Sequence, residues 1–106
     1  MINITFNPKD LELKVEGHAK HGKKGEDIVC AAISTLFYTL GEALHQSEDM
    51  MLSPLVFDDK DGEGYIKCSP KEEYAGNIAR TYWTILVGME MVANNYPKNV
   101  TFEVRG

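Results

Sequence analysis

Apolar and polar side chains alternate in two runs at the start of the chain, residues 2–6 and 11–15. This period is typical of β-strands that bury one face. Residues 7–10, Asn-Pro-Lys-Asp, are turn formers and separate the two runs. The pattern therefore predicts a hairpin whose second strand ends at Gly17-His18. Its buried face would carry Ile2, Ile4, Phe6, Leu11, Leu13 and Val15.

The hydrophobic period then changes to that of a helix. Residues 19–25 are polar and basic with two glycines, which favours a mobile surface loop. From about Glu26 or Asp27 to about Gln46, apolar residues recur at helical spacing. Asp27 is suited to be the N-cap, because its carboxylate can accept hydrogen bonds from the first-turn N–H groups. The apolar stripe of this helix is Val29, Ile33, Leu36, Phe37, Leu40 and Leu44.

A second hairpin and a second helix follow. Leu55–Phe57 and Gly64–Cys68 read as short strands on either side of a turn at Asp58–Gly62. Ser69-Pro70 is expected to open a helix that runs to about Asn94, and Val100–Val104 alternates as a last strand. The buried stripe predicted for this helix is Ile78, Tyr82, Ile85, Leu86, Met89 and Val92; Trp83, Met89 and Met91 are interpreted as core or dimer contacts.

Together the elements give the order ββαββαβ, which predicts a single α+β domain over residues 1–106. Two main helices would pack on an antiparallel-rich sheet of about five strands. The length of 106 residues and the 43% apolar content suit one globular domain rather than a disordered chain.

Charge and composition narrow the function classes. The formal net charge of −5 argues against a general nucleic-acid binder, which would carry a basic face. The sequence shows no targeting segment and no apolar run near the roughly 20 residues that span a bilayer. We therefore expect a cytoplasmic protein without a membrane or direct nucleic-acid partner. In that reducing compartment, Cys30 and Cys68 are expected to be thiols.

Cys30 is the first candidate for chemistry, because it falls in the first turn of the predicted helix. The free N–H groups and the positive end of the helix dipole favour a thiolate there. The same N–H groups are candidates for an oxyanion hole. The competing interpretation is an ordinary buried cysteine within a helix.

His18 is the candidate partner of Cys30. It ends a strand just before the predicted loop, which can return the chain toward the helix start. A histidine next to a cysteine can act as general base and then protonate a leaving amine. Ser34 lies one turn beyond Cys30 and could support the site, although a serine bonded to its own helix backbone is an equal alternative.

Two separated blocks of sequence, Gly17-His18-Ala19 and Gly25–Ser34, resemble the signature of the bacterial ribosomal-processing cysteine protease family, Prp. The second block reads Gly-Glu-Asp-Ile-Val-Cys-Ala-Ala-Ile-Ser. The resemblance implies that Cys30 is the nucleophile and His18 its histidine partner. Gly17, Gly25 and Asp27 also match the family pattern, and Asp27 could cap the helix or help to place His18.

The same resemblance implies a function. Family members remove a short N-terminal extension from a bacterial ribosomal protein, large-subunit protein twenty-seven, and form homodimers without a cofactor. The resemblance therefore predicts a cysteine endopeptidase whose partner is that extension. The alternative function is a non-catalytic, ribosome-associated module that binds the peptide in the same groove.

Two groups of residues partly match metal-binding patterns, one for zinc and one for calcium. His18, His21, Cys30 and Asp27 reach the ligand count of a zinc site, but the two histidines lie on a strand end and a loop without helical register. Asp59-Lys60-Asp61-Gly62 resembles part of a calcium loop, yet the required first and last ligand positions fall on Phe57 and Cys68. No metal is therefore predicted.

Overall fold

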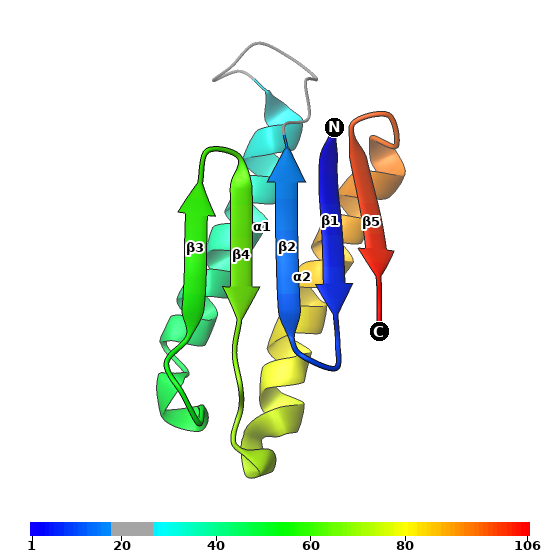
Figure 1. Ribbon diagram of the computed structural model, residues 1–106. Helices are drawn as coiled ribbons and strands as arrows, with labels where there is room; N and C mark the ends of the chain where they lie inside the picture. Colours follow the sequence, from blue (N-terminus) through cyan, green and yellow to red (C-terminus); the bar gives the residue numbers. More distant parts are fainter. Residues whose placement is uncertain (18–26) are drawn as a thin grey trace.

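A computed structural model describes residues 1–17 and 27–106 and shows a sheet with two long helices (Figure 1). The predicted loop at 19–25 lies outside the described residues. The strands are β1 (Ile2–Asn7), β2 (Glu12–Gly17), β3 (Val56–Lys60), β4 (Glu63–Lys67) and β5 (Val100–Val104). The helices are α1 (Ile28–His45) and α2 (Ala75–Asn95), with short 3₁₀ turns η1 (Glu48–Met50) and η2 (Glu72–Tyr74).

The strands form one sheet in the order β3-β4-β2-β1-β5. Three neighbouring pairs are antiparallel, and β1 pairs with β5 in parallel. Both helices cover the same face of the sheet (Figure 1). The α+β class and the element order predicted from the sequence are confirmed.

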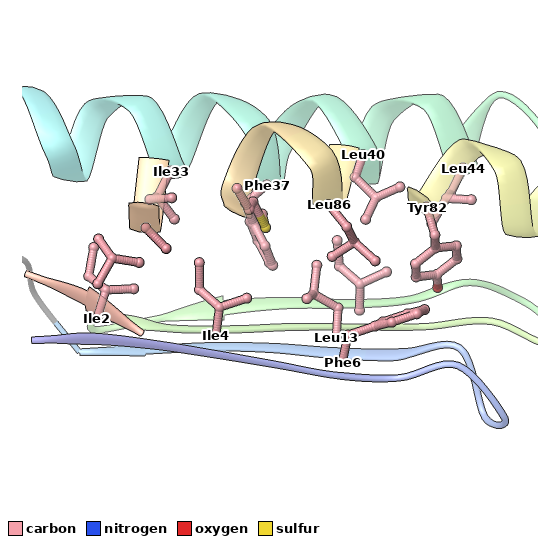
Figure 2. Close-up of a cluster of buried hydrophobic side chains, with 14 of the residues drawn as sticks. Ile2, Ile4, Phe6, Leu13, Ile33, Phe37, Leu40, Leu44, Tyr82 and Leu86 are labelled. Carbon is pink, nitrogen blue, oxygen red and sulfur yellow. The ribbon is translucent and has the colours of Figure 1, made fainter. Parts of the chain in front are cut away.

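The core lies between the helices and the covered face of the sheet (Figure 2). The alternation predicted for the first hairpin is confirmed for Ile2, Ile4, Phe6 and Leu13, which are all buried. Leu11 and Val15 were also predicted to be buried but are only partly buried against the core. Burying each such side chain contributes roughly 1.5–3 kcal/mol. The two helices approach closely where Gly88 faces Leu36, because a Cβ on Gly88 would lie 3.0 Å from that side chain. The helical side of the core consists of Val29, Ile33, Phe37, Leu40, Leu44, Ile78, Tyr82, Leu86, Met89 and Ala93.

Helix α1 is long and apolar enough to span a membrane by length and composition alone, with a mean hydropathy of 1.4. In this fold its apolar stripe packs on the sheet, as a core helix does.

On α2, Met89 is buried, whereas Trp83 and Met91 are 36% and 59% exposed. Met89 is therefore a core residue, and Trp83 and Met91 remain candidates for a contact with another chain.

Three boundaries predicted from the sequence were wrong. Strand β2 begins at Glu12 rather than at Leu11, which lies in the turn with a φ of 51°. Strand β3 continues to Lys60, so the turn is only Asp61-Gly62, and both residues have positive φ angles of 42° and 82°. A two-residue turn of this type matches the twist of the flanking strands. The second long helix begins at Ala75 rather than at Ser69-Pro70. Residues 69–71 are held extended instead, because Leu52 N–H donates to the Ser69 carbonyl and Lys71 N–H donates to the Met50 carbonyl.

Candidate active site

Three segments that are distant in sequence meet at one end of the sheet: the end of β2, the start of α1 and the β3–β4 hairpin (Figure 1). Between them lies a cavity of about 220 Å³. Its lining is formed by Ile2, Val15, Gly17, Cys30, Ile33, Ser34, Phe37, Tyr38, Asp59, Gly62 and Gly64. The structure thus brings together three of the residues selected from the sequence, namely Gly17, Cys30 and Ser34.

Cys30 is the third residue of α1 and is half-buried at the wall of this cavity. The helix begins here because Asp27 caps it, as the sequence predicted. One Asp27 carboxylate oxygen accepts hydrogen bonds from the N–H groups of Val29 at 2.9 Å and Cys30 at 3.0 Å. Asp27 is only 9% exposed, so these bonds also satisfy a buried charge. The cap fixes the backbone that carries the thiol.

The Asp27 cap uses backbone N–H groups that were predicted to form an oxyanion hole. The N–H groups of Val29 and Cys30 donate to the Asp27 side chain, and Ala31 N–H donates to the Asp27 carbonyl at 3.0 Å. Each of these donors already has an acceptor within the helix start. The prediction that the first-turn amides as a group stabilise an oxyanion is therefore not supported, because satisfying the cap uses the same hydrogens.

Ser34 is exposed to the cavity one turn after Cys30. Within the part of the chain that the structure describes, its hydroxyl makes no hydrogen bond. The neighbouring Thr35 behaves differently, since its hydroxyl donates to the Ala31 carbonyl at 2.8 Å. The interpretation of Ser34 as a serine bonded to its own helix is thus wrong, and its hydroxyl can donate to a group in the cavity.

Gly17 ends β2 and borders the same cavity as Cys30. Its φ of +96° favours glycine, and a Cβ there would clash at 2.2 Å with the Met1 carbonyl oxygen. Its N–H donates to the Gly62 carbonyl at 2.8 Å, which ties β2 to the β3–β4 turn. His18 and Gly25 lie outside the described residues. In the sequence, His18 is the residue that follows Gly17.

The second hairpin also lines the cavity, through Asp59, Gly62 and Gly64, and no motif in the sequence predicted this contribution. Gly64 is needed for packing, because a Cβ there would lie 2.7 Å from the Phe37 ring. The Asp61-Gly62 pair was the available signal. A two-residue turn at that pair places Asp59 opposite Gly64, and residues opposite each other share a face of the sheet.

Cys68, the second thiol of the chain, has a structural role. Cys68 was expected to face inward and is buried, with the Tyr82 hydroxyl donating to its sulfur at 3.5 Å. Burial raises the pKa of the Cys68 thiol, although the Tyr82 hydrogen bond acts in the opposite direction.

Residues 1–17 and 27–106 contain no group of three or more His, Cys, Asp or Glu side chains placed to hold a metal. The zinc interpretation remains untested, because His18 and His21 lie outside these residues.

The half-buried thiol of Cys30 lies at a capped helix start, in a cavity that the end of β2 and the β3–β4 hairpin also line. A substrate in this cavity could therefore reach a cysteine nucleophile. The family comparison gives the particular class. The family model described as cysteine protease Prp matches residues 1–101, and the chain belongs to this family. The resemblance stated from the sequence, and with it the prediction of a cysteine protease, is confirmed.

Curated relatives match over nearly their whole length. The ribosomal processing cysteine protease Prp of Mycoplasma genitalium is 30% identical over 100 residues, which cover 94% of this chain and 92% of that protein. The protein of the same name in Staphylococcus aureus is 26% identical over 102 residues, covering 93% and 92% of the two chains.

Solved structures share the fold. A crystal structure from Streptococcus mutans is 31% identical, with a TM-score of 0.66 and coverage of 97% of this chain and 90% of that one. The Staphylococcus aureus Prp protease in complex with a covalently linked product peptide has a TM-score of 0.81 at 22% identity, covering 99% and 100% of the two chains.

Proposed function

We propose that this protein is a cysteine endopeptidase that removes the N-terminal extension of large-subunit ribosomal protein twenty-seven, with Cys30 as nucleophile and His18 as general base. One observation carries the proposal. Gly17, which immediately precedes His18, and Cys30 line the same cavity although 12 positions separate them in the sequence. This shared cavity supports a common site for the two blocks of the family motif, since Gly17 belongs to the first block and Cys30 to the second. The substrate is assigned from the family, whose curated relatives are named for ribosomal processing.

The reaction follows from the two side chains. His18 takes the Cys30 proton as the sulfur attacks the carbonyl carbon of the peptide bond. When the tetrahedral adduct collapses, the C–N bond breaks and His18 gives that proton to the leaving amine. A thioester remains on Cys30. His18 then takes a proton from water, the hydroxide attacks the thioester, and the new carboxyl end leaves as the proton returns to sulfur.

The described residues assist this chemistry in different ways. Asp27 fixes the start of α1 and so the position of Cys30, through its bonds to the Val29 and Cys30 amides. Ser34 offers a hydroxyl donor inside the cavity. Gly17 supplies the positive φ with which the chain leaves β2 toward His18. We further propose that the protein acts in the cytoplasm, where both of its cysteines stay reduced.

A homodimer also belongs to this proposal, as the family implies. Helix α2 supports it with an exposed apolar stripe at four-residue spacing, formed by Trp83, Val87 and Met91. If a second copy covers this stripe, Val87→Glu will sediment as a monomer while the matched surface variant Glu90→Gln stays dimeric. A wild-type protein that sediments as a monomer at high concentration contradicts the dimer.

The activity is tested with a synthetic peptide that spans the junction between the extension and the mature protein. Mass spectrometry should show two products from the wild-type chain and none from Cys30→Ala or His18→Ala, with folding checked by circular dichroism. Undiminished cleavage by Cys30→Ala would overturn the mechanism. Binding of the peptide without cleavage by the wild-type chain would support the non-catalytic module instead.

A further inference from the structure

Strand β3 (Val56–Lys60) is an edge of the sheet. Among the described residues it pairs only with β4, and all five of its residues are exposed. An edge strand presents backbone N–H and C=O groups on which another extended chain can pair. The free side of β3 is therefore a template for one more strand.

The hairpin register shows which residues of β3 carry those free groups. The turn at Asp61-Gly62 is flanked by Lys60 and Glu63, and residues that flank a two-residue turn exchange ladder hydrogen bonds. Bonded and non-bonded pairs alternate in an antiparallel ladder, so Asp59 and Phe57 belong to non-bonded pairs. Their N–H and C=O groups consequently point to the open edge.

The far side of β4 gives the same alternation independently. Gly17 N–H donates to the Gly62 carbonyl, which directs the backbone groups of Gly62 toward β2. By the alternation along a strand, the backbone groups of Gly64 also point toward β2, and those of Glu63, the residue between them, point toward β3. The assignment of the free edge to Asp59 and Phe57 therefore rests on the hairpin register and, separately, on the hydrogen bond between Gly17 and Gly62.

The side chains of these two residues face the helical layer beside α1. Asp59 lines the cavity that contains Cys30. Phe57 lines a second cavity of about 330 Å³ farther along α1, whose walls include Tyr38, Gly41 and Leu55. Tyr38 borders both cavities, so the two hollows adjoin along the seam between α1 and β3. A chain on the free edge of β3 would run past both.

We propose that the substrate polypeptide binds as an added strand on the free edge of β3, pairing with Asp59 and Phe57. This inference rests on the proposed protease function and names how the same site holds its substrate. A strand rises about 3.3 Å per residue, so the two pairing points lie about 7 Å apart and engage substrate residues two positions apart. Backbone pairing supplies affinity, and alternate substrate side chains face the hollows beside α1.

The occupant is the substrate rather than a second copy of β3 for two reasons. The edge is continuous, through Asp59 and Tyr38, with the cavity that holds Cys30. The strand and its turn also carry Asp58, Asp59 and Asp61 against the single cation Lys60. Each copy of this segment carries an excess of negative charge, so bringing two copies together is disfavoured by repulsion between like net charges.

The first test is a backbone N-methyl scan of the synthetic substrate, with kcat/KM measured for each peptide. N-methylation removes a hydrogen-bond donor and leaves the side chain unchanged. We expect alternation: two positions that are two residues apart should each lose about three- to tenfold, and the position between them should stay near the unmodified value. A flat profile, or losses without alternation, would overturn the inference.

The second test is the variant Asp59→Pro, compared with Asp59→Ala. Proline removes an N–H that points to the open edge, so the β3–β4 ladder is retained, and both variants lose the carboxylate. Asp59→Pro should cleave the peptide at least about threefold less efficiently than Asp59→Ala at matched thermal stability. Equal efficiencies would overturn the inference, as would loss of a dimer in Asp59→Pro alone, because the edge would then hold a second copy.

The outcomes separate this inference from the proposed function. If the wild-type chain does not cut the unmodified peptide, the proposed function fails. If it cuts the peptide but the scan is flat, the protease assignment stands and only the added strand is wrong. Should Asp59→Pro fail to fold, the N-methyl scan on the wild-type chain still decides the question.

Discussion

The two cysteines of this chain have opposite surroundings. Cys30 is half-buried at the start of α1 and lines a cavity with Ser34 and Asp59. Cys68 follows β4, is 4% exposed, and has its sulfur against the Tyr82 hydroxyl in the core. The two thiols therefore differ in accessibility, and accessibility is one requirement for a cysteine to react with a substrate. The surroundings of Cys30 and of Cys68 can be altered separately, so the difference between the two thiols can be tested directly.

The largest expected effect is on turnover. Cys30→Ser keeps the size and polarity of the side chain but replaces the thiol with a far weaker nucleophile, so kcat/KM should fall by at least about a thousandfold. The matched variant Cys68→Ser should stay within about threefold of wild type, because that sulfur lies outside the cavity. Peptide cleavage followed by chromatography measures both. A larger loss of kcat/KM in Cys68→Ser than in Cys30→Ser would contradict the different roles assigned to the two cysteines.

Accessibility gives the next largest difference. In the native protein, iodoacetamide should label Cys30 at least about tenfold faster than Cys68, because the reagent can reach the cavity wall but not the core. Mass mapping of peptides from a timed reaction gives the two rates. As an internal control, both cysteines should react at similar rates in denaturant. Equal rates in the folded protein would show that Cys30 is as protected as Cys68.

The cap that positions Cys30 should make a measurable contribution to stability. Asp27→Ala leaves the Val29 and Cys30 amides without their side-chain acceptor, so we expect a loss of about 1–2 kcal/mol in the free energy of unfolding. Asn is also a good N-cap, and Asp27→Asn should recover most of that loss. Urea denaturation followed by circular dichroism measures both variants. Similar losses of unfolding free energy in Asp27→Ala and Asp27→Asn would mean that the charge of Asp27, and not its capping hydrogen bonds, stabilises the protein.

The smallest effect concerns Cys68 and pH. Burial raises the pKa of its thiol above the ordinary value of 9.0, so the unfolded chain ionises first as the pH rises. Stability is therefore complete below pH 9 and falls as the pH rises toward the folded-state pKa, by at most about 1.4 kcal/mol per pH unit for one group. Urea denaturation between pH 8 and pH 10 should show a shallower decline for Cys68→Ala. Parallel declines would contradict this assignment.

Most of the fold was predictable because the periodicities are local. The alternation in the first hairpin, the helical stripe after Asp27 and the inward position of Cys68 all follow from the order of neighbouring residues. The pairing of β1 with β5 was not predictable in this way, because residues about 100 positions apart meet there and no short pattern records it. The late start of α2 likewise depends on a pairing of residues 69–71 with residues 50–52.

The candidate site was predictable in part. The position of Cys30 beside its cap follows from local helix rules, and Gly17 was selected through the family motif. The roles of Asp59, Gly62 and Gly64 depend on the register of a hairpin that lies about 30 residues farther along the chain. The Asp27 cap was predicted, but its conflict with the predicted oxyanion hole was not, because both use the same first-turn donors and only geometry shows which acceptor they have.

The most direct test of the central claim, that Cys30 is the nucleophile, is covalent trapping on the wild-type chain. A peptide that matches the substrate up to the cleaved bond and ends in a chloromethyl ketone carries its electrophile to the reacting group. After digestion, mass spectrometry should find one adduct, on Cys30, and competition by unmodified substrate should suppress it. An adduct on Cys68, or equal labelling of both cysteines, would contradict the account.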